Sequence, residues 1–211
     1  DSVPPGVAPR YNIAPTQPVL ALTNEGHRDA AFLRWGLIPP WAKDPAIGNR
    51  MINARAETLA EKPSFRAAFR QRRCVIFADG FYEWQKPAGD GRKIPLYIRV
   101  REGQPFAMAG LWEVWKDEAA DEWIRSCTII TAEPNGFMAR IHNRMPVILD
   151  RPAMDRWLTP GEMAPADLMP LLRPYPDEAA MSAYEVARLV NDPTNDLPGC
   201  IAPLPGQGPL L

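Results

Sequence analysis

Proline occurs 25 times among the 211 residues of this chain, and this content limits the possible folds more than any other feature. Proline fixes φ and lacks a backbone N–H, so it interrupts helices and central strands. Regular elements must therefore be short and joined by irregular connections, which argues against a helical bundle. The length allows one domain with a sizeable core, so we expect a single domain over 1–211 with an irregular Pro/Gly-rich tail over 192–211.

Short apolar runs predict strands, and several of them pair as hairpins. We expect an α+β fold with a mainly antiparallel, barrel-like sheet, short peripheral helices and long irregular loops. Residues 38–58 contain too many Pro and Gly for a regular element and predict a long loop. Strands are predicted at 19–23, 31–37, 74–85, 94–100, 106–115, 123–132, 145–149 and 182–187. Helices are predicted at 64–72, 135–141, 153–158 and 166–172, the first with Ser64 as N-cap and with Phe65 and Phe69 on one face.

The net charge of −1 does not point to a polyanionic partner, but the distribution of charge is uneven. Residues 1–100 have a balance of +6 and the remainder a balance of −7. The basic excess is concentrated in 50–73, which is either a phosphate-binding face or a solvated helix face. The basic residues of this segment are Arg50, Arg55, Lys62, Arg66, Arg70, Arg72 and Arg73.

Composition also indicates a cytoplasmic protein, associated with the nucleoid if the source is bacterial. No apolar run approaches the roughly 20 residues that span a bilayer, and no secretory signal is present. Three cysteines without CxxC spacing, namely Cys74, Cys127 and Cys200, indicate reduced thiols. No cluster has metal-ligand spacing and no glycine-rich loop opens a helix, so we expect neither a metal nor a cofactor.

Glu83 is the first candidate for chemistry. In "FADGFYEWQ" the alternation of a strand places Phe81, Glu83 and Gln85 on one face, and Tyr82 and Trp84 on the other. A carboxylate among aromatic residues is either desolvated, which raises its pKa and suits a general acid or base, or held in a structural ion pair with an arginine.

His142 is the second candidate. It lies between Arg140 and Arg144 in "ARIHNRMPVIL", where it is either a general acid or base or a capping histidine in a loop. His27 has the sequence context of a surface turn and receives no role. No GxSxG or HExxH motif supplies a nucleophile, and Cys74 and Cys127 lie in apolar strands, so they are expected to be buried and inert.

Polar and aromatic residues elsewhere could bind nucleic acid. Asn53 and Arg55 share one face if "INAR" is extended, and an amide beside a guanidinium can hold a polar substrate and a phosphate. Pro15, Trp41 and Trp84 could either stack on bases or pack inside the protein.

Six motifs occur in order along the chain and together resemble one family. They are "RYNIAPTQ", "RWGLIPPWA", "INARAET", "FADGFYEWQ", "TIITAEPN" and "IHNRMPVIL". This set, which runs from about Arg10 to at least Leu158, is similar to the SOS-response-associated peptidase (SRAP) family, whose members shield abasic sites in single-stranded DNA.

The resemblance implies a mechanism that starts at an N-terminal cysteine. Family members begin Met-Cys-Gly-Arg, and autoproteolytic loss of Met exposes the cysteine, which we expect ahead of Asp1. Its α-amine attacks the ring-opened aldehyde of the abasic site to give a Schiff base, and its thiol then closes a thiazolidine. An α-amine with a pKa of about 7.7–8.0 is partly neutral at working pH, and ring closure by the adjacent thiol is intramolecular. Such an (auto)peptidase could also catalyse β-elimination, as an AP lyase does.

The same resemblance assigns roles to residues of this chain. Asn53 would position the N-terminal cysteine, Glu83 would be the acid or base near the amine, and His142 would assist ring opening and proton transfer. The DNA would be held by Arg55, Lys62, Pro15, Trp41, Trp84 and Thr131. Lys62 stands in "EKPSF", where family members often carry Arg, so it would act as a point charge and not as a bidentate fork.

We therefore expect a monomeric DNA-damage response protein whose partner is single-stranded DNA with abasic sites. Two alternatives remain from the sequence. One is a cysteine peptidase that cleaves other proteins in trans, and the other is a non-covalent single-stranded nucleic-acid-binding module.

Overall fold

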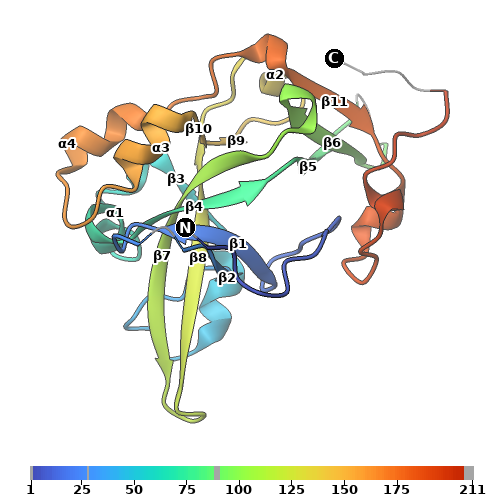
Figure 1. Cartoon of the computed structure of the whole chain (residues 1–211). Coiled ribbons are helices and arrows are strands. Elements are labelled where there is room, and N and C mark those ends of the chain that lie inside the picture. The colour runs from blue at the N-terminus through green and yellow to red at the C-terminus, as the bar shows by residue number, and fades with distance from the viewer. Residues whose placement is uncertain (1, 28, 88–90, 207–211) are drawn as a thin grey trace.

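A closed β-barrel forms the centre of the computed structural model, which describes residues 2–27, 29–87 and 91–206 (Figure 1). Its strands are β1 (Pro18–Thr23), β2 (Ala31–Trp35), β4 (Arg73–Ala78), β7 (Phe106–Asp117) and β8 (Glu122–Ala132). They pair in the order β7–β4–β1–β2–β8, and β8 pairs again with β7, which closes the ring. In this ring β2–β8 is parallel and the other pairings are antiparallel. The predicted α+β fold with a mainly antiparallel, barrel-like sheet is confirmed.

Both faces of the central strands are buried, which explains their continuous apolar sequences. On β4, Cys74 and Ile76 belong to one apolar cluster while Val75 belongs to a second one. Residues from the helices, such as Phe69 and Trp157, complete the second cluster. The helices are α1 (Arg66–Gln71), α2 (Gly136–Ala139), α3 (Arg151–Trp157) and α4 (Pro165–Leu168). Within the described residues, no helix has the length and apolar character needed to cross a membrane.

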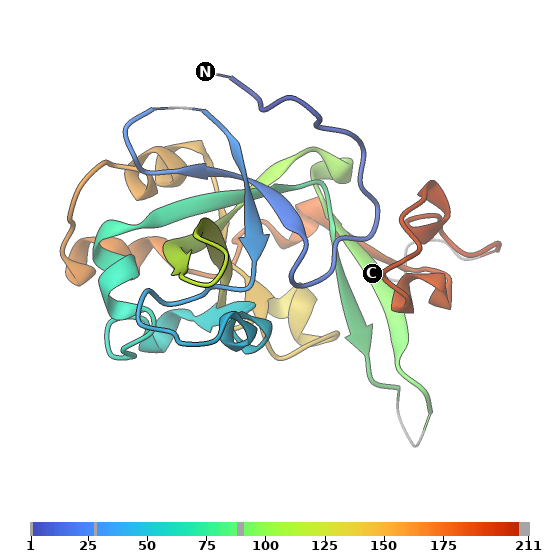
Figure 2. The same ribbon diagram turned by 90° about the horizontal axis from the view of Figure 1, so that it is seen from below.

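The predicted strand 74–85 is wrong as a single element, because the chain changes sheets at Asp79 and Gly80. β4 ends at Ala78, and the next strand belongs to a second sheet with the order β11–β6–β5. Gly80 passes under the Tyr97 ring so closely that an added Cβ would lie 2.2 Å from Tyr97 Cζ. Only glycine can make this passage. The strands of the second sheet, which Figure 2 shows extending away from the barrel, are β5 (Phe81–Gln85), β6 (Ile94–Val100) and β11 (Met181–Glu185).

The predicted strand 145–149 is two short strands, β9 (Met145–Pro146) and β10 (Ile148–Leu149). β7 and β8 pair with each other as far as Gly110 and Ile129. Beyond that point β10 pairs with β7, and β9 pairs with β8. Val147 joins both strands, because its N–H donates to Ile130 O at 2.9 Å and its carbonyl accepts from Ala109 N at 2.8 Å. We call Met145–Leu149 the wedge.

The expectation of a loop without regular structure over 38–58 is wrong. This segment contains a 3₁₀ turn, η1 (Pro45–Arg50), then β3 (Asn53–Arg55) and a second turn, η2 (Ala56–Thr58). β3 pairs in parallel with β8, from Asn53 opposite Ile129 to Arg55 opposite Thr131. The pairing is non-local, so the local Pro and Gly content does not reveal it.

Most other predicted elements are present with shifted ends. α1 begins at Arg66 and Ser64 is not its N-cap, because the N–H groups of Phe65 and Arg66 both donate to Lys62 O in a preceding turn. Phe65 and Phe69 are both buried, as predicted. α3 begins earlier than predicted, since Asp150 caps it by accepting from Ala153 N at 2.8 Å. The remaining 3₁₀ turns are η3 (Arg101–Gly103), η4 (Met169–Leu171), η5 (Glu178–Ala180), η6 (Arg188–Asn191) and η7 (Pro198–Cys200).

The described part of the predicted tail, residues 192–206, holds the N-terminal segment. The Asp196 carboxylate accepts from Arg10 Nε and from the backbone N–H groups of Tyr11 and Asn12. The Asn12 amide in turn donates to three backbone carbonyls of residues 190–195. Residues 207–211 of the predicted tail lie outside the described residues.

Arg73 is fully buried, and its charge faces backbone carbonyls instead of a carboxylate. Its guanidinium donates to the carbonyls of Trp157, Arg70, Thr159 and Gly161 at 2.5–3.2 Å. Burial lowers the pKa of Arg73 to about 10, so it remains protonated at neutral pH. The network ties β4 to the end of α3 and the segment that follows it.

The basic segment 50–73 is accordingly not one continuous phosphate-binding face. Arg73 is internal, Arg72 pairs with the buried Glu113, and Arg70 pairs with Glu162. Four residues of the segment are exposed and form no ion pair within the described residues, namely Arg50, Arg55, Lys62 and Arg66.

We predict that Arg73→Met lowers the free energy of unfolding by about 2–4 kcal/mol, because buried carbonyls lose their donors. Urea unfolding followed by circular dichroism measures this change. The matched control is Arg70→Met, which removes an exposed ion pair and should cost less than about 1 kcal/mol. Equal stabilities of the two variants would contradict a structural role for the Arg73 network.

Candidate functional site

Glu83 and His142 come together although they belong to different parts of the fold. Glu83 lies on β5 of the second sheet, and His142 follows α2 and precedes the wedge. Glu83 Oε1 is 3.7 Å from His142 Nδ1, which is an ion-pair distance and too long for a hydrogen bond. The Glu83 side chain is 22% exposed and that of His142 is 43% exposed, so substrate could reach the histidine.

The environment of Glu83 favours its protonated form. Burial raises the pKa of Glu83 above its usual value, and the nearby His142, the Trp84 backbone N–H and Lys93 offset only part of this effect. A carboxyl group with a raised pKa exchanges protons closer to neutral pH, which suits a general acid or base.

The backbone of Arg144 orients the His142 ring. His142 Nδ1 is 3.2 Å from both Arg144 N and Arg144 O, so it can accept from the N–H when neutral and donate to the carbonyl when protonated. Nε2 makes no hydrogen bond within the described residues, which leaves it available to a ligand.

Arg144 is a structural anchor in this arrangement. Its guanidinium makes a bidentate pair with Glu57, at 2.8 and 3.0 Å, and also donates to the carbonyl of Thr131 at 2.5 Å. The Arg144 hydrogen bonds hold the pKa of Glu57 below its usual value. The Glu57 pair joins Arg144, the residue before the wedge, to the turn after β3, and the bond to Thr131 joins it to β8. These contacts fix the backbone around His142.

Asn53 and Arg55 share the exposed face of β3, while Ala54 between them is buried. The alternation predicted for "INAR" is thus present. Arg55 lies opposite Thr131 on β8, and Thr131 lies opposite Pro146 of the wedge. This register brings the exposed guanidinium of Arg55 to the same end of the sheet as Arg144.

The other candidates lie elsewhere or have internal partners. Trp84 is on the opposite face of β5 from Glu83, where its Nε1 donates to Asn191 Oδ1 at 2.7 Å. Pro15 is half-buried in a turn before β1. Lys62 is exposed ahead of α1, and Thr131 is buried and accepts from Arg144.

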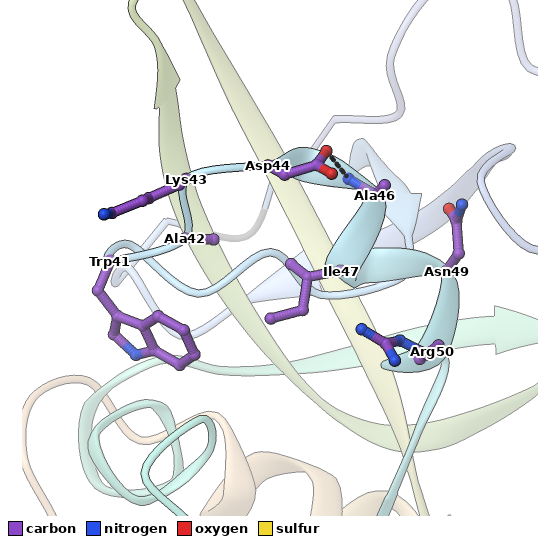
Figure 3. A pocket seen from close by; sticks show the side chains of 8 residues that line it. All are labelled: Trp41, Ala42, Lys43, Asp44, Ala46, Ile47, Asn49 and Arg50. Atoms are coloured by element: carbon purple, nitrogen blue, oxygen red, sulfur yellow. Dashed lines mark hydrogen bonds between the residues drawn. The ribbon is translucent and has the colours of Figure 1, made fainter.

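Trp41 is 58% exposed and borders a pocket of about 770 Å³. Residues of the 41–50 segment line it, and Figure 3 shows Trp41, Ile47 and Arg50 around the hollow. An aromatic ring can stack on a base while the neighbouring guanidinium binds a phosphate. Glu83 and His142 do not line this pocket, so the candidate acid/base pair and the candidate stacking surface are separate.

The cysteines of the chain are not accessible nucleophiles. Cys74, Cys127 and Cys200 are free and buried, as expected for the first two. Burial raises the pKa of Cys127 to about 12 and that of Cys74 well above its usual value, so both are neutral thiols at physiological pH.

Two residues of this site received no role from the sequence. Glu57 is one of the two acidic residues of the basic segment 50–73, and its pairing with Arg144 joins residues that are far apart in the chain. Gln85 donates from Nε2 to Arg140 O at 2.9 Å, beside the acid/base pair. The only signal in the sequence was that Gln85 lies two residues after Glu83, on the same face of an alternating strand.

Comparison with known proteins agrees with the motif resemblance. Residues 2–193 match the family model described as SOS response associated peptidase (SRAP). The chain is 50% identical over 189 residues to the abasic site processing protein YoaM of Bacillus subtilis, which covers 89% of this chain and 82% of that protein. It is 34% identical over 237 residues to the abasic site processing protein HMCES of Xenopus tropicalis, which covers 96% of this chain and 69% of that protein.

A solved structure supports the same assignment. The crystal structure of a protein from Bacteroides thetaiotaomicron superposes with a TM-score of 0.79 at 30% identity, and covers 89% of this chain and 82% of that one. The family inferred from the six motifs is therefore confirmed. This chain belongs to the SOS response associated peptidase (SRAP) family.

Proposed function

We propose that this protein processes abasic sites in single-stranded DNA by capturing them covalently on an N-terminal cysteine. The observation that carries the proposal is the Glu83–His142 pair, which offers proton transfer at a place where no cysteine of the described chain is accessible. Relatives named for abasic site processing support the same substrate. The proposal requires a cysteine ahead of the described residues, exposed when Met is removed autoproteolytically.

The reaction forms one ring and releases one water molecule. The cysteine α-amine adds to the aldehyde carbon of the ring-opened sugar, and the carbinolamine loses water to give an imine. The thiol then adds to the imine carbon, and the amine nitrogen takes up the thiol proton to complete a thiazolidine. Each step moves a proton, and two groups with different environments can exchange protons in turn.

Glu83 and His142 have separate roles in this scheme. Glu83 as a carboxylate accepts a proton from the attacking amine, and its raised pKa lets it return that proton to the departing hydroxyl. His142 assists opening of the sugar ring through Nε2, which has no partner within the described residues. Asn53, on the exposed face of β3, positions the cysteine.

Exposed basic and aromatic groups hold the DNA in this proposal. Arg55 binds a phosphate next to the lesion, and Lys62 adds a second positive charge. Trp41 offers an exposed ring beside its pocket for a neighbouring base. Pro15 and Trp84 have internal surroundings that support a packing role more than direct stacking.

The first test is covalent capture by full-length protein whose N-terminal cysteine is verified by intact mass. We expect a denaturation-resistant adduct with abasic single-stranded DNA, and Glu83→Gln should form it about 10²–10⁴-fold more slowly. Glu133→Gln, an exposed glutamate, is the matched control and should react at the wild-type rate. Absence of the adduct from verified protein would refute the proposal. Cleavage of peptides in trans, or salt-sensitive DNA binding without an adduct, would favour the two alternatives.

The same variant separates catalysis from stability. A carboxyl whose pKa is raised by folding stabilises the protein below its unfolded pKa, and this stabilisation disappears as pH rises through the folded pKa. Glutamine is neutral at every pH, so Glu83→Gln does not lose this stabilisation as pH rises. At pH 8 the free energy of unfolding of the variant should therefore equal or exceed that of the wild type. A strongly destabilised variant would mean that Glu83 is needed mainly for folding.

The pH dependence of capture provides a second prediction. Glu83 acts as a base when ionised, so the rate should rise as pH increases through its pKa. Protonated His142 lowers that pKa, and His142→Ala should therefore move the acidic limb of the pH–rate profile to higher pH. Rates measured from pH 5 to 8 by quenched gel assays test this. An acidic limb at the same pH in His142→Ala as in wild type would show that His142 does not affect the pKa of Glu83.

The third prediction concerns Arg55. If it binds a phosphate, Arg55→Gln should reduce the slope of log affinity against log salt concentration by about 0.7, as expected for one single-strand phosphate contact. Fluorescence anisotropy with an undamaged oligonucleotide measures the slope. Arg70→Gln, whose side chain pairs with Glu162, is the control and should leave the slope unchanged. Equal slopes for wild type and Arg55→Gln would exclude the contact.

A further inference from the structure

Gln85 forms a hydrogen bond that links the two sides of the acid/base pair. Its side chain lies on the same face of β5 as Glu83, two residues further along the strand. Gln85 Nε2 donates to the backbone carbonyl of Arg140 at 2.9 Å. Arg140 in turn lies two residues before His142, so the bond and the ion pair run side by side.

The two sides need such a link because they are built on different sheets. β5 is an edge strand of the second sheet and pairs only with β6 within the described residues. His142 is instead held by elements that contact the barrel, through the wedge and the Arg144–Glu57 pair. Among the described residues, the polar contacts between β5 and the turn after α2 are the Gln85 bond and the Glu83–His142 pair itself.

The turn that receives the Gln85 bond is itself anchored at its other end. Asn135 caps α2 by accepting from Met138 N at 2.9 Å, and its amide donates to Tyr175 O. Glu178 accepts from Gly136 N at 2.7 Å. At the end of the turn, His142 N donates to Met138 O at 2.8 Å. A shift of β5 relative to this anchored turn would therefore change the Glu83–His142 distance.

We propose that Gln85 is a positioning residue that sets the separation of Glu83 and His142 by tying β5 to the carbonyl of Arg140. The functional meaning of this role rests on the proposed abasic-site chemistry, but the role itself is a statement about geometry. Without the bond, the Glu83–His142 pair is the one remaining polar contact between β5 and the turn among the described residues, so their separation can increase, and the electrostatic effect of His142 on Glu83 weakens with distance.

The direction of the resulting change follows from the groups that face Glu83. Burial raises its pKa, whereas His142, Lys93 and the Trp84 backbone N–H lower it. Lys93 and Trp84 belong to the β5–β6 hairpin and would move with Glu83. His142 lies across the gap, so loss of the Gln85 bond weakens its contribution, and the amount by which His142 lowers the pKa of Glu83 should decrease. Greater exposure of Glu83 to solvent would lower its pKa as well, but equally in the presence and absence of His142.

The experiment is a ¹³C NMR titration of the Glu83 carboxyl group in the full-length protein. Gln85→Met keeps the length of the side chain but has no N–H donor, and should reduce the rise in titration midpoint that His142→Ala causes. The rise caused by His142→Ala is therefore measured with and without Gln85→Met, and the difference between the two rises isolates the coupling of Gln85 to the pair. The matched control is Gln71→Met, which replaces an exposed glutamine at the end of α1, where it donates to Glu162, and should leave the midpoint unchanged.

A second variant guards against a disturbance caused by methionine alone. Gln85→Leu also lacks the donor and carries neither sulfur nor charge, so it should reduce the rise caused by His142→Ala to the same extent. A rise on His142→Ala that is as large with Gln85→Met or Gln85→Leu as with Gln85 present would overturn the proposal. Unfolding curves recorded in parallel show that each variant is folded.

The outcome of the titration does not depend on the outcome of the capture assay, so the two proposals can be rejected separately. If wild-type protein forms no adduct, the proposed function is wrong, and the titration still decides the role of Gln85. If wild type forms the adduct, the shift of the acidic limb of its pH–rate profile that His142→Ala causes should likewise be smaller in the Gln85→Met background. A shift on His142→Ala that is equally large in both backgrounds, in the limb and in the midpoint, would leave the proposed function intact and remove Gln85 from it.

Discussion

The wedge, Met145–Leu149, is the element on which the rest of the site depends. β7 and β8 cannot stay paired beyond Gly110 and Ile129, and without a third segment their backbone groups would be unsatisfied. Val147 bonds to both strands and fills the split. This insertion fixes the chain just ahead of it, so that His142 and Arg144 acquire defined positions. The wedge thus completes the split end of the barrel and also places the candidate histidine.

Arginines of similar sequence context serve different purposes in this fold. Arg73 is internal and binds carbonyls, whereas Arg144 forms a forked pair that joins the turn after β3 to β8. Arg55 remains exposed on β3 without an ion pair among the described residues. The net charge of a segment therefore overstates the charge that a ligand can reach, because part of it holds the protein together.

Alternation and helical spacing predicted the features that depend on neighbouring residues in the chain. The β5–β6 and β7–β8 hairpins, the buried pair Phe65 and Phe69, and the exposed face of β3 all follow from alternation or helical spacing. Features set by distant partners were not predictable in the same way. The change of sheet at Gly80 depends on the Tyr97 ring, and the regular structure of β3 depends on an edge offered by β8. Glu83 and His142 could be named as candidates, but their pairing across two sheets required the fold.

Gly80 marks the point at which the chain leaves the barrel for the second sheet, where the Tyr97 ring leaves no room for a Cβ. β5 has one strand partner, so it can open at lower free energy than the doubly buried strands of the barrel. Such an opening would carry Glu83 away while the barrel remained intact. If the pair acts as proposed, the temperature at which the protein loses that activity therefore lies at or below the temperature at which the barrel melts.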